Sequence, residues 1–204
     1  MLPVTGAPVH AALLAHVRAL FQECRASLVA AGVPIDSFQD FGAEIDGLPG
    51  KYAAEKHGAL VLAVDPAAAL GFVKAAAPVR GAAASASASS AAAPAPDLPA
   101  GTVYGCIALR DLGDGVAEVK RLFVTPAGRG RGVGRALSQY IIDVAKRLPV
   151  SPADGTPYYT RRIVLDTLVR LPGAIPLYTS LGFSPCAAYC VNPMPDVVYM
   201  EMPL

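Results

Sequence analysis

The sequence has little of what marks a membrane-spanning, secreted or nucleic-acid-binding protein. Much of its 53% apolar content is alanine, and no stretch approaches the roughly 20 consecutive apolar residues that a membrane-spanning helix needs. Residues 1–20 show no basic segment followed by a small-residue cleavage site, which is the pattern of a secretory signal. With 17 Lys and Arg against 16 Asp and Glu, the chain has no general positive field for nucleic acid. We therefore expect a cytoplasmic protein with neither a membrane nor a nucleic acid as a partner.

Metal-ligating and disulfide-forming residues are also few and scattered. There is no CxxC pair, and no histidine lies near any of the four cysteines, which are Cys24, Cys106, Cys186 and Cys190. His10 and His16 are six residues apart, which places them on different faces of a helix rather than at the i, i+4 spacing of a metal-binding pair. We expect reduced thiols and no metal.

The first half of the chain predicts two helices, one strand and an insertion. A length of 204 residues suits one α/β domain. Apolar residues recur at helical spacing over residues 9–31 and 38–48, and ALVLAV at 59–64 reads as a strand. Residues 75–100 are almost wholly Ala, Ser and Pro, with too few large apolar groups to offset the entropy of ordering. We expect a flexible insertion there, within a single domain over residues 1–204 whose core covers about 38–204.

The second half alternates strand and helix patterns. A hairpin-turn signal, Gly113-Asp114-Gly115, separates its first two strands. The strand, helix and strand that follow make a parallel βαβ unit with a right-handed crossover. The predicted elements are strands at 102–109 and 116–124, a helix at 133–148, a strand at 162–168, a helix at 174–181 that ends at Gly182, and strands at 183–189 and 197–202.

A glycine-rich turn, RGRGVGRA at 129–136, lies between the strand at 116–124 and the next helix. A helix N-terminus exposes unpaired N–H groups and the positive end of the helix dipole, and glycines let an anion approach the main chain, so this turn predicts a phosphate site. A P-loop is excluded because no Gly-Lys-Ser/Thr ending follows, and G-x-G-x-x-G is excluded because its third glycine position holds Leu137. The pattern that remains is R-x-x-G-x-G, formed by Arg129, Gly132 and Gly134.

In these residues the chain resembles the GNAT superfamily of acyl-CoA-dependent N-acetyltransferases, whose hallmark is a strand, then Q/R-x-x-G-x-G/A, then a helix. The resemblance extends to EVKRLFV at 118–124 and LYTSLGF at 177–183, in the family's order. It implies a GNAT-like α/β fold, with a mixed, mostly antiparallel sheet, a central parallel βαβ unit and flanking helices. It also implies an acyltransferase that moves an acetyl group from its co-substrate acetyl-CoA to a primary amine, by direct attack in a ternary complex.

The resemblance further assigns roles to individual positions. The amides from about Arg131 to Ala136 hold the pyrophosphate, and the backbone of Leu122 and Val124 pairs with the pantetheine arm like an extra strand. The predicted cofactor-binding residues are Leu122, Phe123, Val124, Arg129, Gly130, Arg131, Gly132, Val133, Gly134, Arg135 and Ala136. The predicted catalytic residues are Tyr178, which stabilises the leaving thiolate, and Glu118, which takes the proton of the amine.

Several alternatives stay open on the residues alone. Glu118 beside Lys120 also fits a solvated row of ion pairs, and Tyr178 also fits an ordinary core aromatic. Many relatives carry an asparagine where this chain has Leu171-Pro172-Gly173, which leaves a water relay open as the base. The alternative function is a non-catalytic acyl-CoA-binding sensor or interaction module.

The acceptor is the least defined part of the prediction. The resemblance places the first two helices beside the amine, and that region carries four carboxylates, which we expect to face water: Asp36, Asp40, Glu44 and Asp46. The expected partner is a small-molecule or peptide amine, and the sequence leaves open whether the chain forms a homodimer.

Overall fold

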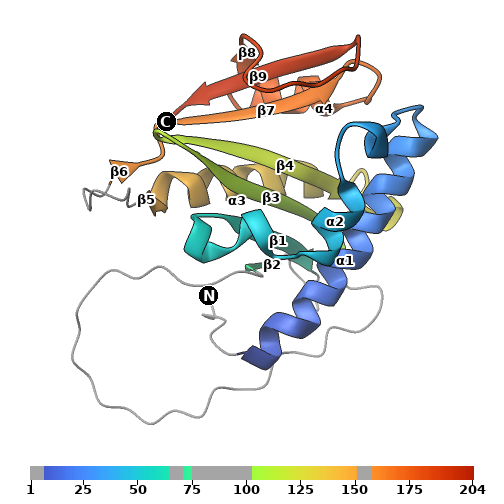
Figure 1. Ribbon diagram of the computed structural model, residues 1–204, viewed down its shortest axis with the longest axis vertical. Coiled ribbons are helices and arrows are strands. Elements are labelled where there is room, and N and C mark those ends of the chain that lie inside the picture. The colour runs from blue at the N-terminus through green and yellow to red at the C-terminus, as the bar shows by residue number, and fades with distance from the viewer. Residues whose placement is uncertain (1–6, 65–70, 75–102, 151–157) are drawn as a thin grey trace.

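The computed structural model describes residues 7–64, 71–74, 103–150 and 158–204 (Figure 1). The helices are α1 (Ala7–Ala30), α2 (Phe41–Asp46), α3 (Val133–Arg147) and α4 (Ala174–Ser180). The strands are β1 (Ala59–Val64), β2 (Gly71–Lys74), β3 (Val103–Gly113), β4 (Val116–Val124), β5 (Pro149–Val150), β6 (Tyr158–Tyr159), β7 (Arg162–Leu168), β8 (Ser184–Pro185) and β9 (Val197–Pro203). None of the helices described is both long and apolar enough to cross a bilayer.

In the described part of the chain, seven strands form one mixed sheet in the order β2-β1-β3-β4-β7-β9-β8. Neighbouring strands are antiparallel except β4 and β7, which are parallel and are connected through α3. This confirms the predicted α/β class, a mostly antiparallel sheet with a central parallel βαβ unit. β5 and β6 form a separate two-stranded ladder.

Helices cover both faces of the sheet (Figure 1). α1 and α2 lie on one face, where Leu13, Val17 and Phe21 on α1 pack against alternate residues of β1 and β3. α3 and α4 lie on the other face, against the residues of the same strands that point the opposite way. Because β1 lies between the two layers, all six of its residues are buried, and this explains why ALVLAV shows no polar alternation.

The hairpin between β3 and β4 forms as predicted. Gly113 pairs with Val116, so that Asp114 and Gly115 make a two-residue turn with φ values of 51° and 74°. Positive φ at both central residues matches the right-handed twist of the flanking strands, which is why Asp-Gly is a reliable hairpin signal.

Several elements differ from the sequence-based prediction. β3 extends to Gly113 instead of ending at 109, and β5 and β6 were not predicted. β2 was not predicted at all, and α2 is a six-residue helix preceded by a 3₁₀ turn at Ile35–Ser37 instead of one longer helix. β8 is two residues long instead of seven, because the chain leaves the sheet after Cys186, whose N–H donates to the Tyr199 carbonyl of β9 at 2.9 Å. α1 also contributes fully buried residues to the hydrophobic core. The insertion predicted at 75–100 lies outside the described residues.

Candidate active site

The central feature of the sheet is a gap between β4 and β7. Both strands are fully described, yet they pair only at their beginnings, and beyond Glu118 and Val164 they diverge (Figure 1). The paired residues are Val116 with Arg162, Ala117 with Ile163 and Glu118 with Val164. The rest of β4, from residue 119 to 124, therefore has a free edge on the side of β7.

A bulge in β4 lies where the gap opens. From Lys120 to Phe123, β4 advances by three residues while β3 advances by two, and Arg121 has a φ of 59°. An extra residue in one strand bends that strand away from its neighbours. The bulge thus curves β4 away from β7 at the point where their pairing has ended.

The turn before α3 leaves a run of main-chain amides without partners. Gly130 and Gly132 have φ values of 70° and 76°, and a Cβ on either would meet nothing within 4 Å. No N–H group of residues 130–135 donates a hydrogen bond to any residue that the structure describes, whereas Ala136 donates to the Gly132 carbonyl at 3.0 Å. The free run ends at Arg135, one residue before its predicted end. Such amides at the start of a helix, with the dipole behind them, favour an anion.

A groove of about 800 Å³ connects this turn with the gap between β4 and β7. Arg131 is not among its lining residues, and its guanidinium lies 4.4 Å from the centroid of the Tyr104 ring. Ala136 does not border the groove either. The groove is lined by the other nine predicted cofactor-binding residues, which are Leu122, Phe123, Val124, Arg129, Gly130, Gly132, Val133, Gly134 and Arg135.

Tyr178, from α4, borders the same groove and is also a packing residue. Its ring meets the Phe183 ring edge-on, with the centroids 5.5 Å apart. Burial, and then the negative charge of Asp166, raise the pKa of Tyr178 above its ordinary value of 10. The phenol is therefore protonated at neutral pH and can donate a hydrogen bond into the groove.

Glu118 is a fully buried carboxylate held by three donors. Its side chain is 0% exposed, and it accepts hydrogen bonds from the Arg110 guanidinium, from the Tyr189 hydroxyl at 3.0 Å and from the Lys120 ammonium at 3.2 Å. Such partners replace the hydrogen bonds to water that a buried carboxylate loses. The alternative of a solvated row of ion pairs does not describe Glu118, which also borders neither the groove nor the cavity described below.

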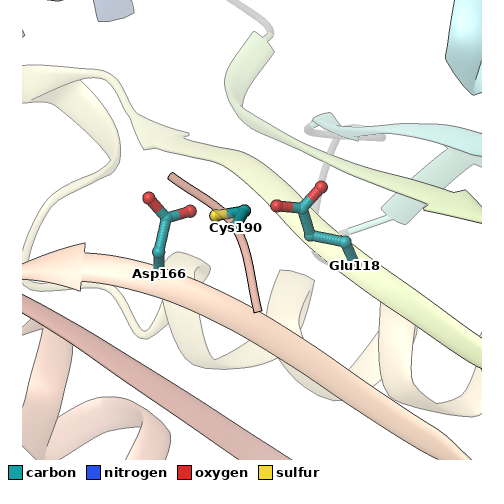
Figure 2. Close-up of side chains that lie close together, drawn as sticks. All are labelled: Glu118, Asp166 and Cys190. Carbon is teal, nitrogen blue, oxygen red and sulfur yellow. The ribbon is translucent and has the colours of Figure 1, made fainter. Parts of the chain in front are cut away.

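Asp166, on β7, faces Glu118 across the gap, and Cys190 lies between them (Figure 2). The Lys120 ammonium lies 3.5 Å from Asp166 and the Tyr189 hydroxyl donates to it at 3.5 Å, so the same two groups contact both carboxylates. Glu118, Asp166 and Cys190 are close enough to ligate one metal ion, since their ligand atoms lie within 4.8 Å of one another. However, the Lys120 ammonium already supplies a cation to both carboxylates.

A second cavity, of about 500 Å³, lies on the α2 side of the sheet. α2 and the turn at Gly50–Tyr52 form one wall, and Arg110, Cys190 and Val191 contribute to the other. Three residues, Gln39, Lys120 and Asp166, line both this cavity and the groove. The two spaces therefore meet beside Asp166.

The four carboxylates expected to face water do not all do so. Asp36 pairs with Arg25 on the surface, Asp46 is exposed, and the exposed Asp40 caps α2 by accepting the Ala43 amide at 3.0 Å. Glu44 instead points inward and bonds Arg121, Lys51 and Tyr52. Burial alone would raise the pKa of Glu44, but the hydrogen bonds and charges of Arg121 and Lys51 outweigh it and lower the pKa to about 2.

Comparison with known proteins places this arrangement in a family. The model for "Acetyltransferase (GNAT) domain" matches residues 97–185, which contain the gap, the glycine turn and α4. An N-acetyltransferase of Schizosaccharomyces pombe, itself uncharacterised, is 40% identical over 50% of this chain and 57% of its own length. An IAA acetyltransferase of Azospirillum brasilense is 37% identical over 52% of this chain and 63% of its own length. A GNAT-family acetyltransferase of Staphylococcus aureus shares the fold, with a TM-score of 0.57 at 15% identity over 91% of this chain and 92% of that one.

This chain has a GNAT superfamily domain over the residues that the family model matches, 97–185. It covers less than two thirds of the length of either curated relative. The GNAT fold explains why the strand β4, the turn and α4 lie together although they are far apart in the sequence: all three border the groove that begins at the gap in the sheet.

The sequence-based prediction missed several residues of this GNAT site. Asp166 was read only as part of a strand, although a carboxylate within the apolar run RIVLDTL is an available signal. Arg110, Lys51 and Tyr189 carried no pattern of their own. They come to the site through antiparallel pairing of β3 with β4, the turn after α2, and the segment that leaves the sheet after β8.

Proposed function

We propose that this chain is an N-acetyltransferase that moves the acetyl group of acetyl-CoA to a primary amine by direct attack. The observation that carries the proposal is the meeting of two spaces beside Asp166 and Lys120. One is a groove with unpaired amides along it, and the other is a cavity bounded by α2. Two reactants that enter from opposite sides can approach within about 3–3.5 Å only at such a junction.

The free amides of residues 130–135 fit a diphosphate, because the cradle has no Cβ at Gly130 or Gly132 and the helix dipole adds attraction for an anion. Arg129 and Arg135 border the same groove and supply positive charge. The free edge of β4 at Leu122 and Val124 offers main-chain groups to an extended pantetheine arm, in the manner of an added strand.

Proton transfer requires a base at the junction, because an alkyl amine with a pKa of about 10 arrives protonated at neutral pH. Asp166 takes that proton, since its carboxylate is 11% exposed and borders both spaces. Glu118 supports it from behind through Lys120 and Tyr189, which contact both carboxylates. In this arrangement Glu118 positions the base instead of meeting the amine itself.

The amine nitrogen then attacks the thioester carbonyl, the new N–C bond forms, and the C–S bond breaks. The amide does not keep the second proton of the amine nitrogen, and that proton ends on the sulfur. Tyr178 stabilises the departing thiolate with a hydrogen bond, for which burial and Asp166 keep the phenol protonated. The chain's own residues thus supply both the base and the hydrogen-bond donor to the thiolate.

Two substitutions at one position test the cofactor site. The Cβ of residue 134 points toward Val124 and Leu177 in the groove, at 3.6 and 3.7 Å, so Gly134→Ala fits at ordinary contact distance. Gly134→Glu places a carboxylate against the predicted diphosphate site and should abolish acetyl-CoA binding in a calorimetric titration, whereas Gly134→Ala should retain it. Equal affinity in both variants would contradict the cofactor site.

Turnover separates the enzyme from a non-catalytic acyl-CoA-binding module. Thiol release from acetyl-CoA should exceed the rate of hydrolysis for at least one member of a panel of amino acids, polyamines, aminoglycosides and peptide N-termini. If acetyl-CoA binds and no amine accelerates thiol release, the proposed transferase function is wrong and the module is correct.

A further inference from the structure

Charged residues of both signs interlock around the smaller cavity, and the cations are in excess. Three carboxylates contact four cations, and the seven residues are Glu44, Glu118, Asp166, Lys51, Arg110, Lys120 and Arg121. The remaining carboxylate of the lining, Asp40, lies exposed at the rim and is engaged in capping α2. The inner set therefore carries one more positive than negative charge.

Lys51 is the excess cation. Glu44 already accepts two hydrogen bonds from Arg121, at 2.6 and 3.0 Å, and one from the Tyr52 hydroxyl at 2.9 Å. A carboxylate offers about four acceptor sites, so Lys51 takes only the last of them. The Lys51 ammonium has three donors, uses one on Glu44, and remains 36% exposed on the cavity wall. It therefore has donors left for a ligand.

Arg110 also presents unused donors to this cavity. It reaches Glu118 through Nε, and its two terminal amino groups hydrogen-bond no residue in the part of the chain that the structure describes. The side chain is 28% exposed and lines the cavity. A guanidinium with a free planar fork matches the geometry of a carboxylate.

The positions of these groups give a bound molecule a direction. Lys51 and Arg110 line only the smaller cavity, whereas Asp166 lines both spaces at their junction. Glu44 also lines the cavity, but its acceptor sites are engaged by Arg121, Lys51 and Tyr52, and Glu118 is fully enclosed. A ligand in the cavity thus meets the free donors of Lys51 and Arg110, which line this cavity alone, and, at the junction, the carboxylate of Asp166 beside Lys120.

We infer that the acceptor is a small amine that also carries a carboxylate, with its amine beside Asp166 and its carboxylate on Lys51 and Arg110. The inference rests on the proposed acetyl transfer and adds the substrate class. An amino acid matches both Asp166 and the pair of Lys51 and Arg110, whereas a diamine of the same length places a second cation against Lys51.

The first experiment compares acceptors that differ only at the far end. Glycine, β-alanine and γ-aminobutyrate are tested against the alkylamines and diamines of equal chain length, as acceptors in thiol release from acetyl-CoA. At the best chain length we expect kcat/KM for the amino acid to exceed that of both analogues by about tenfold or more, the effect of one charge-assisted hydrogen bond. Equal or better turnover of the diamines overturns the inference.

The second experiment reverses the charge of the excess cation. Lys51→Glu should lower kcat/KM for the amino acid by about tenfold to a hundredfold and raise it for the diamine. Lys51→Gln, which leaves Glu44 with its bonds to Arg121 and Tyr52, should show the same loss without the reversal. The matched control is Lys56→Glu, because Lys56 is exposed and outside the cavity lining, and it should leave both values unchanged.

A binding measurement separates this inference from the proposed function. Calorimetric titration of the same amino acid into the protein–CoA complex should show binding that Lys51→Glu weakens by a similar factor. Binding without thiol release contradicts the transferase and keeps the carboxylate site. Thiol release with alkylamines, with no effect of Lys51→Glu on binding or turnover, keeps the transferase and overturns the carboxylate site.

Discussion

Asp166 belongs to the candidate site because of where it lies along β7, and not because the residues next to it in the sequence are unusual. It is one carboxylate in a strand whose other residues from 163 to 168 are apolar or Thr, and it lies two residues beyond the last β4–β7 pair, at Val164. Had the two strands stayed paired, this side chain would lie against β4 instead of beside a gap. Its partners, Lys120, Tyr189 and Asn192, come from β4 and from the segment before β9.

Asp166→Asn should therefore remove the base while keeping the shape of the site. General base catalysis contributes about 10²- to 10⁴-fold, so we expect kcat to fall by about 10²-fold or more and the acidic limb of the kcat/KM profile against pH to flatten. Glu118→Gln should lower kcat and leave that limb in place, because Glu118 borders neither space. Asp46→Asn, at an exposed position on α2, is the control. Loss of the acidic limb in Glu118→Gln alone would make Glu118 the base, as the sequence indicated.

At the scale of elements, the sequence predicted well wherever a local pattern decides the structure. β1 and β7 have the predicted bounds, and the Asp114-Gly115 turn forms because both positions need a positive φ. β2 was missed because a strand of four residues beside an alanine-rich stretch is too short to show an alternation of apolar and polar residues. The long strand predicted from 183 fails because the chain leaves β9 after Cys186, and Tyr189 bonds Glu118 instead.

α2 and the bulge of β4 are joined by a contact that no local pattern encodes. Arg121 reaches across 77 positions to Glu44 with two hydrogen bonds, and its guanidinium also lies 4.0 Å from the centroid of the Phe41 ring. A helix of six residues is too short for its period to tell an inward glutamate from an outward one. This is the physical reason why Glu44 was expected to face water.

The Glu44 contact makes the α2–β4 junction sensitive to acid. The folded pKa is about 2 against an ordinary 4.5, so the unfolded state binds more protons between these values and stability falls as pH drops through that window. The shift corresponds to about 3 kcal/mol, fully present above about pH 5. Urea unfolding of the wild type and Glu44→Gln should show a difference in free energy that is constant near neutral pH and shrinks by about that amount toward pH 2.

A surface pair provides the comparison for this acid effect. Asp36 bonds Arg25 with three hydrogen bonds, but both side chains are exposed. Water screens such a pair. The difference in free energy of unfolding between the wild type and Asp36→Asn should therefore change much less between neutral pH and pH 2. A larger change for Asp36→Asn than for Glu44→Gln would contradict the role of burial in the α2–β4 contact.

At the scale of the whole molecule, the sheet is one layer that splits at its centre, and everything assigned to function lies along the split or beyond it toward α2 (Figure 1). In the sequence, the alanine-rich segment connects the edge strand β2 with β3. We propose that residues 75–100 are an insertion outside a single catalytic domain. The register shows what their replacement must span.

Lys74 lies opposite Val61, and Val103 lies opposite Val64, on the two sides of β1. β2 and β3 are both antiparallel to β1, hence parallel to each other, and a connection between them has to cross about 10 Å sideways and about 10 Å back along the strands. Five extended residues cover that distance, and crossovers between parallel strands commonly use about a dozen.

Replacing the 28 residues 75–102 by a Gly/Ser linker of about 12 residues should therefore preserve the domain. The shorter loop lowers the entropic cost of closure by roughly 0.7 kcal/mol, so the unfolding midpoint should stay level or rise slightly, and acetyl-CoA affinity should not change. Thermal unfolding and calorimetric titration measure both, and a variant with the same 28 residues in scrambled order separates the effect of length from that of sequence. A scrambled variant that loses the fold or binds acetyl-CoA more than tenfold weaker would show that these residues belong to the core, because length and composition are unchanged in it.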